Sequence, residues 1–351
     1  MKAMALNGCC TIKAGGVDET RSELPVTSEP LSMVEWPRPV PGKKDILIKV
    51  STCGVCHTEL DEIEGRLVPP RFPIILGHEI VGRIEALGAE VTRFREGDRV
   101  GVTWIHSSCG VCRFCREGKE NLCDHYEATG LHAHGGYSEY TLVSESFACP
   151  IPDAFSDAQA APLLCAGVVG YRALRLTGIR KGQILGLYGF GASAHIAIQV
   201  AKHWGNEVFV FTREGQTAHQ GLAKKLGADW VGATGQMPPE RLDCAIDFTP
   251  VGAPIKEALR CLQKGGRVVV NAIRKVDDIP PLDYATLLWH EKELKSVANV
   301  TRADGEAFLP LAAQIGICPE VQEFPLNRAN EALVLLKKGI MQGAGVLRVS
   351  S

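Results

Sequence analysis

The chain has 351 residues, of which 45% are hydrophobic and 22% charged, and its formal net charge is −2. These values are typical of a globular protein and exclude a disordered, collagen-like or coiled-coil chain. At ~150 residues per domain the length predicts two domains, and the small net charge excludes a generally basic surface for nucleic acid.

Neither a membrane span nor a secretory leader is expected. No segment approaches ~18 consecutive apolar residues, and the N-terminus turns polar at Asn7 and Gly8, before an apolar stretch of ~7–15 residues is reached. We therefore expect a cytoplasmic protein without a membrane partner. In that reducing compartment the thirteen cysteines are expected to be thiols or metal ligands rather than disulfides.

Two stretches of different character divide the chain. Up to about residue 155, short strands such as 45–51 alternate with glycine and proline turns, which predicts a β-rich domain. Over residues 156–298, apolar strands alternate with helical segments, which is typical of a parallel sheet with helices on both faces. The tail 299–351 is thin for a domain of its own and is expected to return to the first domain. The predicted fold class is α/β with a second, β-rich domain.

Four cysteines form a compact cluster in a lobe at about 106–125. They follow the pattern C-x2-C-x2-C-x7-C and are Cys109, Cys112, Cys115 and Cys123. Four thiolates complete a tetrahedron around zinc and leave no open position, which predicts a structural site rather than a catalytic one. An iron–sulfur cluster also takes four thiolates, but these spacings fit neither common ferredoxin pattern.

A second group of metal-binding residue types is dispersed along the chain. A catalytic zinc needs three protein ligands and one open position, and two cysteines with one histidine are an allowed set. Cys56, His78 and Cys165 would supply that set. Their spacing does not single them out, and packing of a buried thiol or a hydrogen-bonded core histidine is the competing interpretation for each.

A dinucleotide-binding loop follows the strand at 184–188. Its pattern is G-x-G-x-x-A, and a helix begins within it; the residues are Gly189, Phe190, Gly191, Ala192, Ser193 and Ala194. The helix N-terminus would offer amide donors and a positive dipole to a pyrophosphate. The next strand ends at Thr212 and Arg213 without an acidic residue, which favours NADP(H) because an arginine can contact its 2′-phosphate. The alternative is that Arg213 lies along the adenine and that NAD(H) is used.

Together these motifs resemble those of the zinc-dependent medium-chain alcohol dehydrogenases of the microbial type, from about Asp45 to the end of the chain. The resemblance rests on Cys-His-Thr-Glu at 56–59, Gly-His-Glu at 77–79, the four-cysteine lobe, Leu-Cys-Ala-Gly at 164–167 and Gly-Phe-Gly-Ala-Ser-Ala-His at 189–195. It implies a GroES-like catalytic domain at 1–155 and 299–351, interrupted by a Rossmann domain at 156–298.

The resemblance also implies roles for individual residues. Cys56, His78 and Cys165 would hold the catalytic zinc, and Thr58 would hydrogen-bond the substrate oxygen and pass its proton on. The remaining assignments are His57 beside the cofactor pyrophosphate, Glu59 as the acid that orients the zinc histidine, Glu79 close behind the metal, and Trp104 in the substrate pocket.

Two positions depart from the family pattern. Asp61 occupies the position where a histidine often ends the proton relay, so the exit route of the proton is left open. Val169 occupies the position of a threonine near the nicotinamide and cannot donate that hydrogen bond.

The resulting hypothesis is an NAD(P)-dependent alcohol dehydrogenase with two zinc ions per chain. It would interconvert primary or small secondary alcohols with aldehydes or ketones; the physiological alcohol stays open. A homodimer or homotetramer is expected, with 267–271 as an edge strand that pairs between subunits, as in the family.

The alternative is a zinc-loaded redox-sensing or binding protein on the same fold, since a fold does not fix a function. Cys53, three residues from Cys56, would then form a disulfide and release metal. The competing interpretation of Cys53 is a small buried hydrophobic residue.

Overall fold

The computed structural model of the chain describes residues 1–14 and 23–350. It divides into two compact units, which we call the catalytic unit (Met1–Cys165, Thr301–Ala313 and Cys318–Ser351) and the nucleotide unit (Ala166–Val300 and Gln314–Ile317). No helix within the described ranges is both long and apolar enough to cross a bilayer.

The first boundary lies about ten residues after the position expected from sequence. Helix α3 (Asp157–Pro162) belongs to the catalytic unit because Asp157 is fastened there. Its carboxylate accepts a hydrogen bond from Arg99 Nε at 2.6 Å, and its backbone carbonyl accepts one from Thr52 Oγ1 at 3.0 Å. The change of sequence character at about residue 155 therefore lies inside the unit and does not mark its end.

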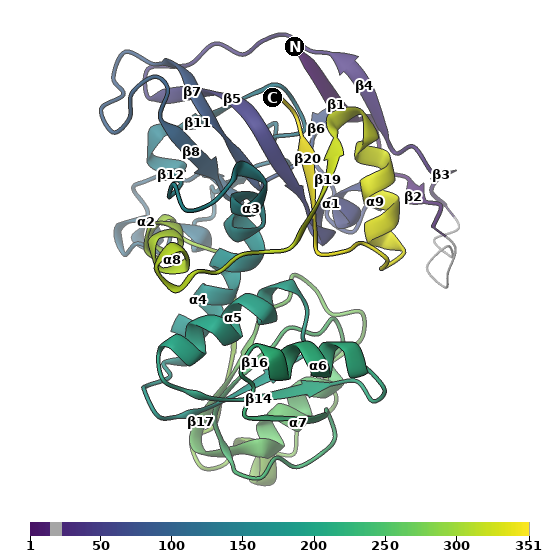
Figure 1. Cartoon of the computed structure of the whole chain (residues 1–351), viewed down its shortest axis with the longest axis vertical. Coiled ribbons are helices and arrows are strands. Elements are labelled where there is room, and N and C mark those ends of the chain that lie inside the picture. The colour runs from purple at the N-terminus through teal and green to yellow at the C-terminus, as the bar shows by residue number, and fades with distance from the viewer. Residues whose placement is uncertain (15–22, 351) are drawn as a thin grey trace. The chain divides into compact units, whose positions relative to one another are not determined.

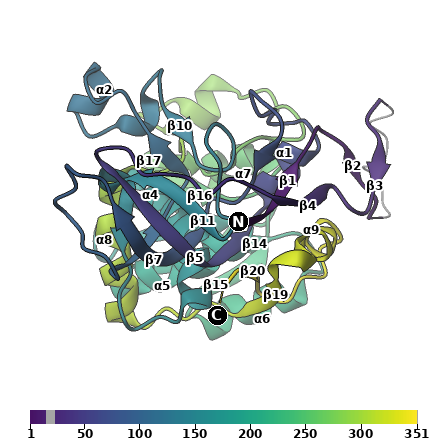
Figure 2. The same ribbon diagram turned by 90° about the horizontal axis from the view of Figure 1, so that it is seen from above.

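The main sheet of the catalytic unit is mostly antiparallel, with strand order β12-β8-β7-β5-β20-β19 and with β11 also paired to β5 (Figure 1). Its strands are β5 (Asp45–Val55), β7 (Ile80–Leu87), β8 (Arg99–Val102), β11 (Tyr140–Ser144), β12 (Ala148–Pro150), β19 (Val321–Pro325) and β20 (Ala344–Arg348). Strand β5 runs beside β7 at the centre of the sheet (Figure 2). Its alternating apolar residues Ile46, Ile48 and Val50 are fully buried in the core.

The C-terminal tail completes this sheet. Strand β20 pairs antiparallel with the end of β5, and Leu347 stands opposite Cys53. The strand that leads into Cys56 is therefore held between β7 and β20. The smaller strands of the unit are β1 (Lys2–Leu6), β2 (Thr11–Ile12), β3 (Val26–Thr27), β4 (Leu31–Glu35), β6 (Ile74–Ile75), β9 (Ile105–Ser107) and β10 (Glu127–Ala128). Its further helices are α1 (His57–Ile63), α2 (Arg113–Arg116), η2 (Glu120–Leu122), η3 (Glu145–Phe147), α8 (Arg302–Ile315, whose last two residues belong to the nucleotide unit), η6 (Leu326–Arg328) and α9 (Ala329–Lys337).

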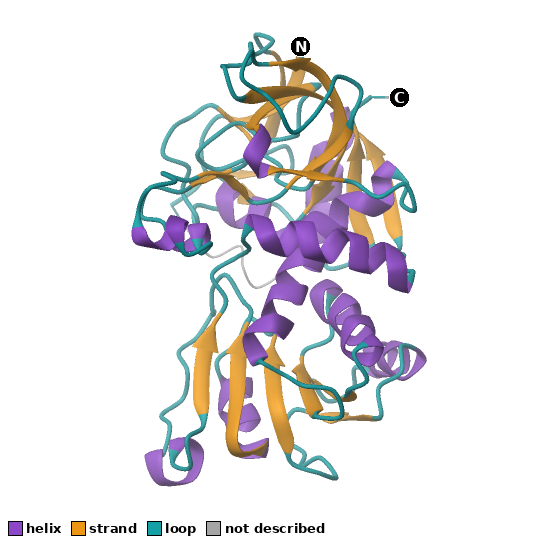
Figure 3. Cartoon of the chain, turned by 90° about the vertical axis from the view of Figure 1, so that its left-hand side faces the viewer, coloured by secondary structure: helices purple, strands orange, loops and turns teal. Residues whose placement is uncertain are grey.

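The nucleotide unit holds a parallel sheet with strand order β15-β14-β13-β16-β17-β18, whose strands lie side by side in Figure 3. They are β13 (Ile184–Tyr188), β14 (Glu207–Thr212), β15 (Trp230–Ala233), β16 (Leu242–Asp247), β17 (Leu262–Val270) and β18 (Glu293–Ser296), and the unit's helical segments are η4 (Leu163–Gly167, which begins in the catalytic unit), α4 (Val168–Thr177), α5 (Ala192–His203), α6 (Thr217–Lys225), α7 (Ala253–Cys261) and η5 (Tyr284–Leu288). The chain order reverses between β13 and β16, so a crevice for ligands is expected at the carboxyl ends of these strands.

Helices cover both faces of the parallel sheet. Crossovers from β13 to β14 and from β16 to β17 leave the centre in opposite directions, so right-handed connections place α5 and α7 on opposite faces. Helix α4 packs on α5 at Gly170, where a Cβ atom would lie 2.9 Å from the carbonyl oxygen of Ser193.

The edge-strand prediction for 267–271 is wrong. These residues lie mostly in β17, which pairs with β16 on one side and β18 on the other. The edge is β18, and all of its residues are exposed. The apolar run in β17 is explained by burial between neighbours rather than by pairing with another subunit.

Candidate functional site

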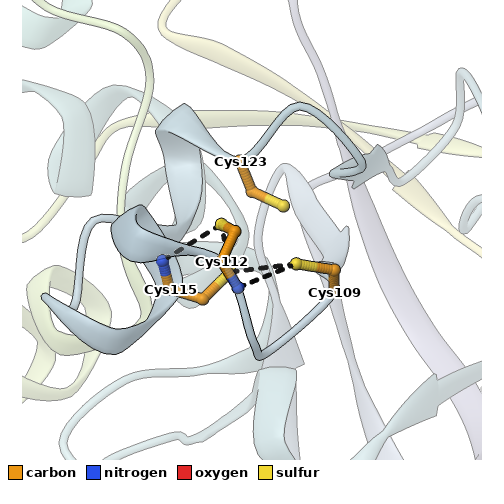
Figure 4. Close-up of side chains that lie close together, drawn as sticks. All are labelled: Cys109, Cys112, Cys115 and Cys123. Atoms are coloured by element: carbon orange, nitrogen blue, oxygen red, sulfur yellow. Dashed lines mark hydrogen bonds between the residues drawn. The ribbon is translucent and has the colours of Figure 1, made fainter.

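The four cysteines of the lobe converge on one centre (Figure 4). Cys109 Sγ and Cys112 Sγ lie 3.9 Å and 3.5 Å from Cys115 Sγ, and the ligand atoms of the group, Cys123 included, all lie within 4.8 Å of one another. Zinc bound at ~2.3 Å by four sulfurs places them ~3.8 Å apart, so this group fits zinc. Backbone N–H groups of Val111 and Cys112 bond Cys109 and lower the pKa of its thiol to about 6, which favours the thiolate that a metal needs.

The lobe is fastened to the returning segment through Glu120, three residues before Cys123. Its carboxylate accepts hydrogen bonds from the Arg302 backbone N–H at 2.8 Å and from Arg302 Nε at 2.9 Å. Burial alone would raise the pKa of Glu120, but these bonds hold it below its usual value. Arg302 is the first residue of α8, so the tail of the chain supports the lobe.

The dispersed metal set meets inside the catalytic unit. Cys56 follows the end of β5, His78 precedes β7, and Cys165 lies in the π-helical turn η4. Cys56 Sγ and Cys165 Sγ lie 3.9 Å apart, again the separation expected of two sulfurs on one zinc. Gly77 sets the direction of His78: its φ is +97°, and a Cβ there would lie 2.4 Å from Tyr137 Cδ1.

Glu59 orients the histidine. Its Oε1 lies 2.7 Å from His78 Nδ1, and its Oε2 accepts the backbone N–H of Cys56 at 2.8 Å, which also caps helix α1. With Nδ1 held by the carboxylate, Nε2 is the nitrogen left for a metal. Burial raises the pKa of Glu59; burial would lower that of His78, but the negative charge of Glu59 raises it well above its usual value.

Glu79 lies closer to the ligands than the sequence analysis assumed. One of its carboxylate oxygens is within 4.8 Å of the ligand atoms of Cys56, His78 and Cys165 and belongs to the same potential metal group. Gly54 makes this possible, because a Cβ at that position would lie 1.7 Å from Glu79 Oε2. Burial raises the pKa of Glu79 well above its usual value.

Two other residues singled out in the sequence, Trp104 and Thr58, contact this centre, and a third, His57, follows Cys56 in the chain. The Trp104 ring packs edge-on against His78, with centroids 5.1 Å apart, and is 6% exposed. Thr58 is buried, and its Oγ1 lies 3.7 Å from Cys56 Sγ. His57, the first residue of α1, is exposed.

Asp61 has a different environment from that of a relay residue. It is buried, and its carboxylate forms an ion pair with Arg66 Nε. The same guanidinium binds Glu64, whose carboxylate also accepts from Lys337 Nζ of α9 at 2.9 Å. This network ties α1 to the C-terminal tail, which gives Asp61 a structural task.

Sequence reasoning missed Glu62. This residue of α1 is fully buried, and neither of its carboxylate oxygens has a hydrogen-bond partner in the part of the chain that the structure describes. Burial, together with the nearby charge of Glu59, raises the pKa of Glu62 well above its usual value. The available signal was its position three residues after Glu59, which places both on one face of the helix.

We expect Glu62→Gln to stabilise the protein at pH 8. Glu62 is easier to protonate in the folded state, so wild-type stability falls as pH rises from ~4.3 towards the raised pKa, whereas the amide does not titrate. Urea unfolding should show a gain on the order of 1–3 kcal/mol at pH 8 that shrinks at pH 6. Glu64→Gln, which loses partners at Arg66 and Lys337, is the control and should destabilise. A Glu62→Gln difference that does not change with pH would contradict this expectation.

Three phosphate-loop residues, Gly189 to Gly191, lie between β13 and α5, and the other three are the first residues of α5. Gly191 and Ala192 are exposed, Ser193 is half-buried, and the Phe190 and Ala194 side chains are buried. Gly191 has φ −95°, which other residues adopt, and a Cβ there would meet no atom within 4 Å. Neither backbone nor packing requires glycine at this position, so its open space fits a ligand that approaches the backbone.

The residues assigned to the rest of the cofactor lie in the nucleotide unit. Thr212 is buried, and its hydroxyl accepts from Gln220 Nε2 at 2.9 Å, whereas Arg213 is exposed. Val169 is half-buried on α4, and its carbonyl accepts from Asn271 Nδ2 at 3.5 Å.

Cys53 takes part in neither metal group. Its side chain is fully buried against Gly77 and Gly136, and burial raises the pKa of the thiol well above its usual value. A thiol that is buried and protonated reacts slowly with oxidants, which disfavours the redox-sensing alternative. All thirteen cysteines are unpaired.

Comparison with known proteins identifies the family. A family model described as "Alcohol dehydrogenase GroES-like domain" matches residues 42–153, and one described as "Zinc-binding dehydrogenase" matches 194–314. A "Probable alcohol dehydrogenase AdhA" from Mycobacterium tuberculosis is 43% identical over 336 residues, covering 94% of this chain and 96% of that protein. The chain belongs to the zinc-dependent medium-chain alcohol dehydrogenases. It is an alcohol oxidoreductase that acts on small molecules, with zinc and a nicotinamide cofactor.

Solved structures of this alcohol dehydrogenase family include complexes with either cofactor. The structure described as "CAD from Helicobacter pylori complexed with NADP(H)" is 25% identical, with a TM-score of 0.83, and covers 99% of this chain and 97% of that one. The acetophenone reductase from Geotrichum candidum in complex with NAD is 26% identical, with a TM-score of 0.81, and covers 99% and 98%. The GroES-like and Rossmann fold expected from sequence is confirmed.

Proposed function

We propose that Cys56, His78 and Cys165 hold the catalytic zinc of this alcohol dehydrogenase, which oxidises primary or small secondary alcohols and reduces the corresponding carbonyl compounds. The observation that carries the proposal is the convergence of two sulfurs and one imidazole in the catalytic unit, with Glu59 against the second imidazole nitrogen. The donor set fits zinc because two thiolates and one neutral imidazole make a formally neutral complex.

Each side chain around this centre would have its own role in the reaction. Zinc supplies a Lewis acid that makes an alcohol hydroxyl easier to deprotonate, and the nicotinamide supplies the hydride acceptor. Thr58 Oγ1, 3.7 Å from Cys56 Sγ, would accept the hydrogen bond of the alcohol hydroxyl and relay the proton, releasing its own hydroxyl proton onward as it takes up that of the substrate, so that the threonine stays neutral. Glu59 would keep His78 Nε2 towards the metal, and Trp104 against His78 would restrict the pocket to small or slender alcohols.

Glu79 also has an oxygen within the ligand group, so an ionised Glu79 would compete with substrate for the open position on the zinc. We propose that the four cysteines of the lobe hold a second, structural zinc, giving two ions per chain.

We propose that NADP(H) is preferred to NAD(H). Arg213 is exposed at the carboxyl end of β14, where a 2′-phosphate would be bound, and no acidic residue occupies the buried position 212. The guanidinium can form paired hydrogen bonds with a phosphate. The adjacent Glu214 is also exposed and is the residue that would hold a ribose hydroxyl if NAD(H) were preferred.

Initial rates with NAD⁺ and NADP⁺ across a series of alcohols test the activity and the preference together. Wild type should show a higher kcat/KM with NADP⁺, and Arg213→Ala should lower that value ~10-fold or more while changing the NAD⁺ value little. Arg180→Ala, also exposed in the nucleotide unit, is the control. Equal losses for both cofactors would remove Arg213 from phosphate recognition.

We also propose that the chain forms a homodimer or homotetramer through β18. This edge strand is exposed along its length, and large apolar side chains in the segment that precedes it in the chain are exposed as well, including Tyr284 at 62% and Trp289 at 55%, whose rings contact each other. An uncovered edge with apolar neighbours favours pairing with a second copy.

Light scattering after size exclusion tests the oligomer. Leu294→Pro removes a backbone donor from β18, so we expect a smaller assembly, whereas Leu122→Lys on the four-cysteine lobe should leave the mass unchanged. A wild-type monomer, or an unchanged oligomer in Leu294→Pro, would contradict the proposed interface.

A further inference from the structure

His195 lies in the first turns of α5 and folds back on the phosphate loop. Its Nε2 lies 2.9 Å from the backbone carbonyl oxygen of Phe190. A carbonyl oxygen only accepts, so Nε2 carries the proton and donates this hydrogen bond. The imidazole also packs against the Phe190 ring, with centroids 4.6 Å apart, and that ring is 4% exposed.

This bond fixes one peptide group of the loop. In a trans peptide the C=O and the following N–H point in opposite directions. Because the Phe190 carbonyl points to the His195 ring, the Gly191 N–H points away from it. Gly191 is exposed, and a Cβ there would meet nothing within 4 Å, so the space around this residue is open.

The rest of the loop is anchored on the sheet side. Gly189 has φ +82°, and its N–H donates to the carbonyl of Phe211 at 2.8 Å. The first glycine is thus fixed by β14 and the Phe190 side chain by the core. The Phe190–Gly191 peptide is the part of the turn whose orientation depends on a side chain of α5.

We propose that His195 is a positioning residue for the cofactor pyrophosphate, which it serves by holding the Gly191 amide towards a phosphate oxygen. In this role His195 acts through Phe190, whose carbonyl its Nε2 engages. The proposal rests on the assignment of this loop to the nicotinamide cofactor. Fixing the amide before binding saves the cost of ordering it on binding, so the effect falls on affinity rather than on hydride transfer.

Isothermal titration of the zinc-loaded enzyme tests the proposal with two probes. ADP-ribose contains the pyrophosphate, whereas 2′-AMP presents the adenosine half without a 5′-phosphate. His195→Leu removes the donor, and we expect ADP-ribose to bind ~3–10-fold more weakly while 2′-AMP binding is unchanged. His195→Gln places an amide N–H at a reach similar to that of Nε2 and should restore most of the affinity. In steady state His195→Leu should raise KM for the cofactor with little change in kcat.

The outcomes separate this proposal from the cofactor assignment. Unchanged ADP-ribose affinity in His195→Leu overturns the positioning role alone. Equal weakening of both probes, or a Gln variant as weak as the Leu variant, overturns it as well, because a general disturbance of the unit would then explain the loss. Wild-type protein that binds neither ADP-ribose nor ADP-ribose 2′-phosphate, the matching fragment of NADP(H), overturns the assignment of the loop to the cofactor, and the positioning role with it.

Discussion

Cys56→Ala is expected to abolish alcohol turnover and to lower the zinc content from two ions per chain to one. Removing one of three protein ligands leaves Cys165 and His78 with Glu79, a set with one thiolate fewer and a weaker affinity for zinc. The four-cysteine lobe shares no residue with this group, so its metal should be retained. Metal analysis by mass spectrometry and a dehydrogenase assay on the same sample measure both effects.

Cys53→Ala is the matched control. Cys53 lies on the same strand three residues away, is fully buried and belongs to neither metal group. Its replacement should cost stability on the order of 1 kcal/mol from a small cavity and leave zinc content and turnover unchanged. Full activity in Cys56→Ala would contradict the assignment of Cys56 as a zinc ligand. Loss of zinc in Cys53→Ala would contradict the assignment of Cys53 to the core.

The two metal groups differ in how far the sequence alone defines them. Cys109 and Cys123 bracket a stretch of 15 residues, so their convergence needs only a local turn and is readable from spacing. Cys56, His78 and Cys165 meet only because β5, the start of β7 and the turn η4 come together in the folded unit. No spacing rule contains that information, and the resemblance to a family supplied it instead.

The environments of Asp61 and Glu62 on α1 depend on residues that are distant in the chain, so the sequence alone does not predict them. Asp61 was considered as a relay residue by its position, but Arg66 and the network that reaches Lys337 decide its environment. Glu62 was not recognised, because a run of acidic residues on a short helix gives no sign of which ones lose solvent. Every residue of α1 from Thr58 to Ile63 is buried, and this burial is set by the packing of the unit around the helix rather than by local sequence.

The prediction that 267–271 is an edge strand misinterprets an apolar run that the sequence does contain. Val268 and Val269 form a continuous apolar run, and both are fully buried. Such a run is typical of a parallel strand covered on both faces and flanked by neighbours. The short segment Glu293–Ser296 is polar enough to be taken for a loop, but its register with β17 makes it the edge.

Thr58→Val is expected to lower kcat for alcohol oxidation at neutral pH by on the order of 10²–10⁴-fold, the usual contribution of a positioned proton acceptor. Valine keeps the branched shape of threonine but has no hydroxyl. The Thr58 side chain is 1% exposed, and its Oγ1 lies 3.7 Å from Cys56 Sγ, so the hydroxyl stands beside a proposed zinc ligand. Single-turnover rates with saturating cofactor measure the step directly.

Thr58→Ser retains the hydroxyl and should keep a rate within ~10-fold of wild type, which separates loss of the proton acceptor from loss of packing. Raising the pH should partly restore Thr58→Val, because hydroxide in solution can then remove the proton that Thr58 no longer accepts. The serine variant should show no such gain. A near-normal rate in the valine variant at neutral pH would show that the proton leaves without Thr58. The exposed His57, adjacent in sequence, would then be the next group to replace.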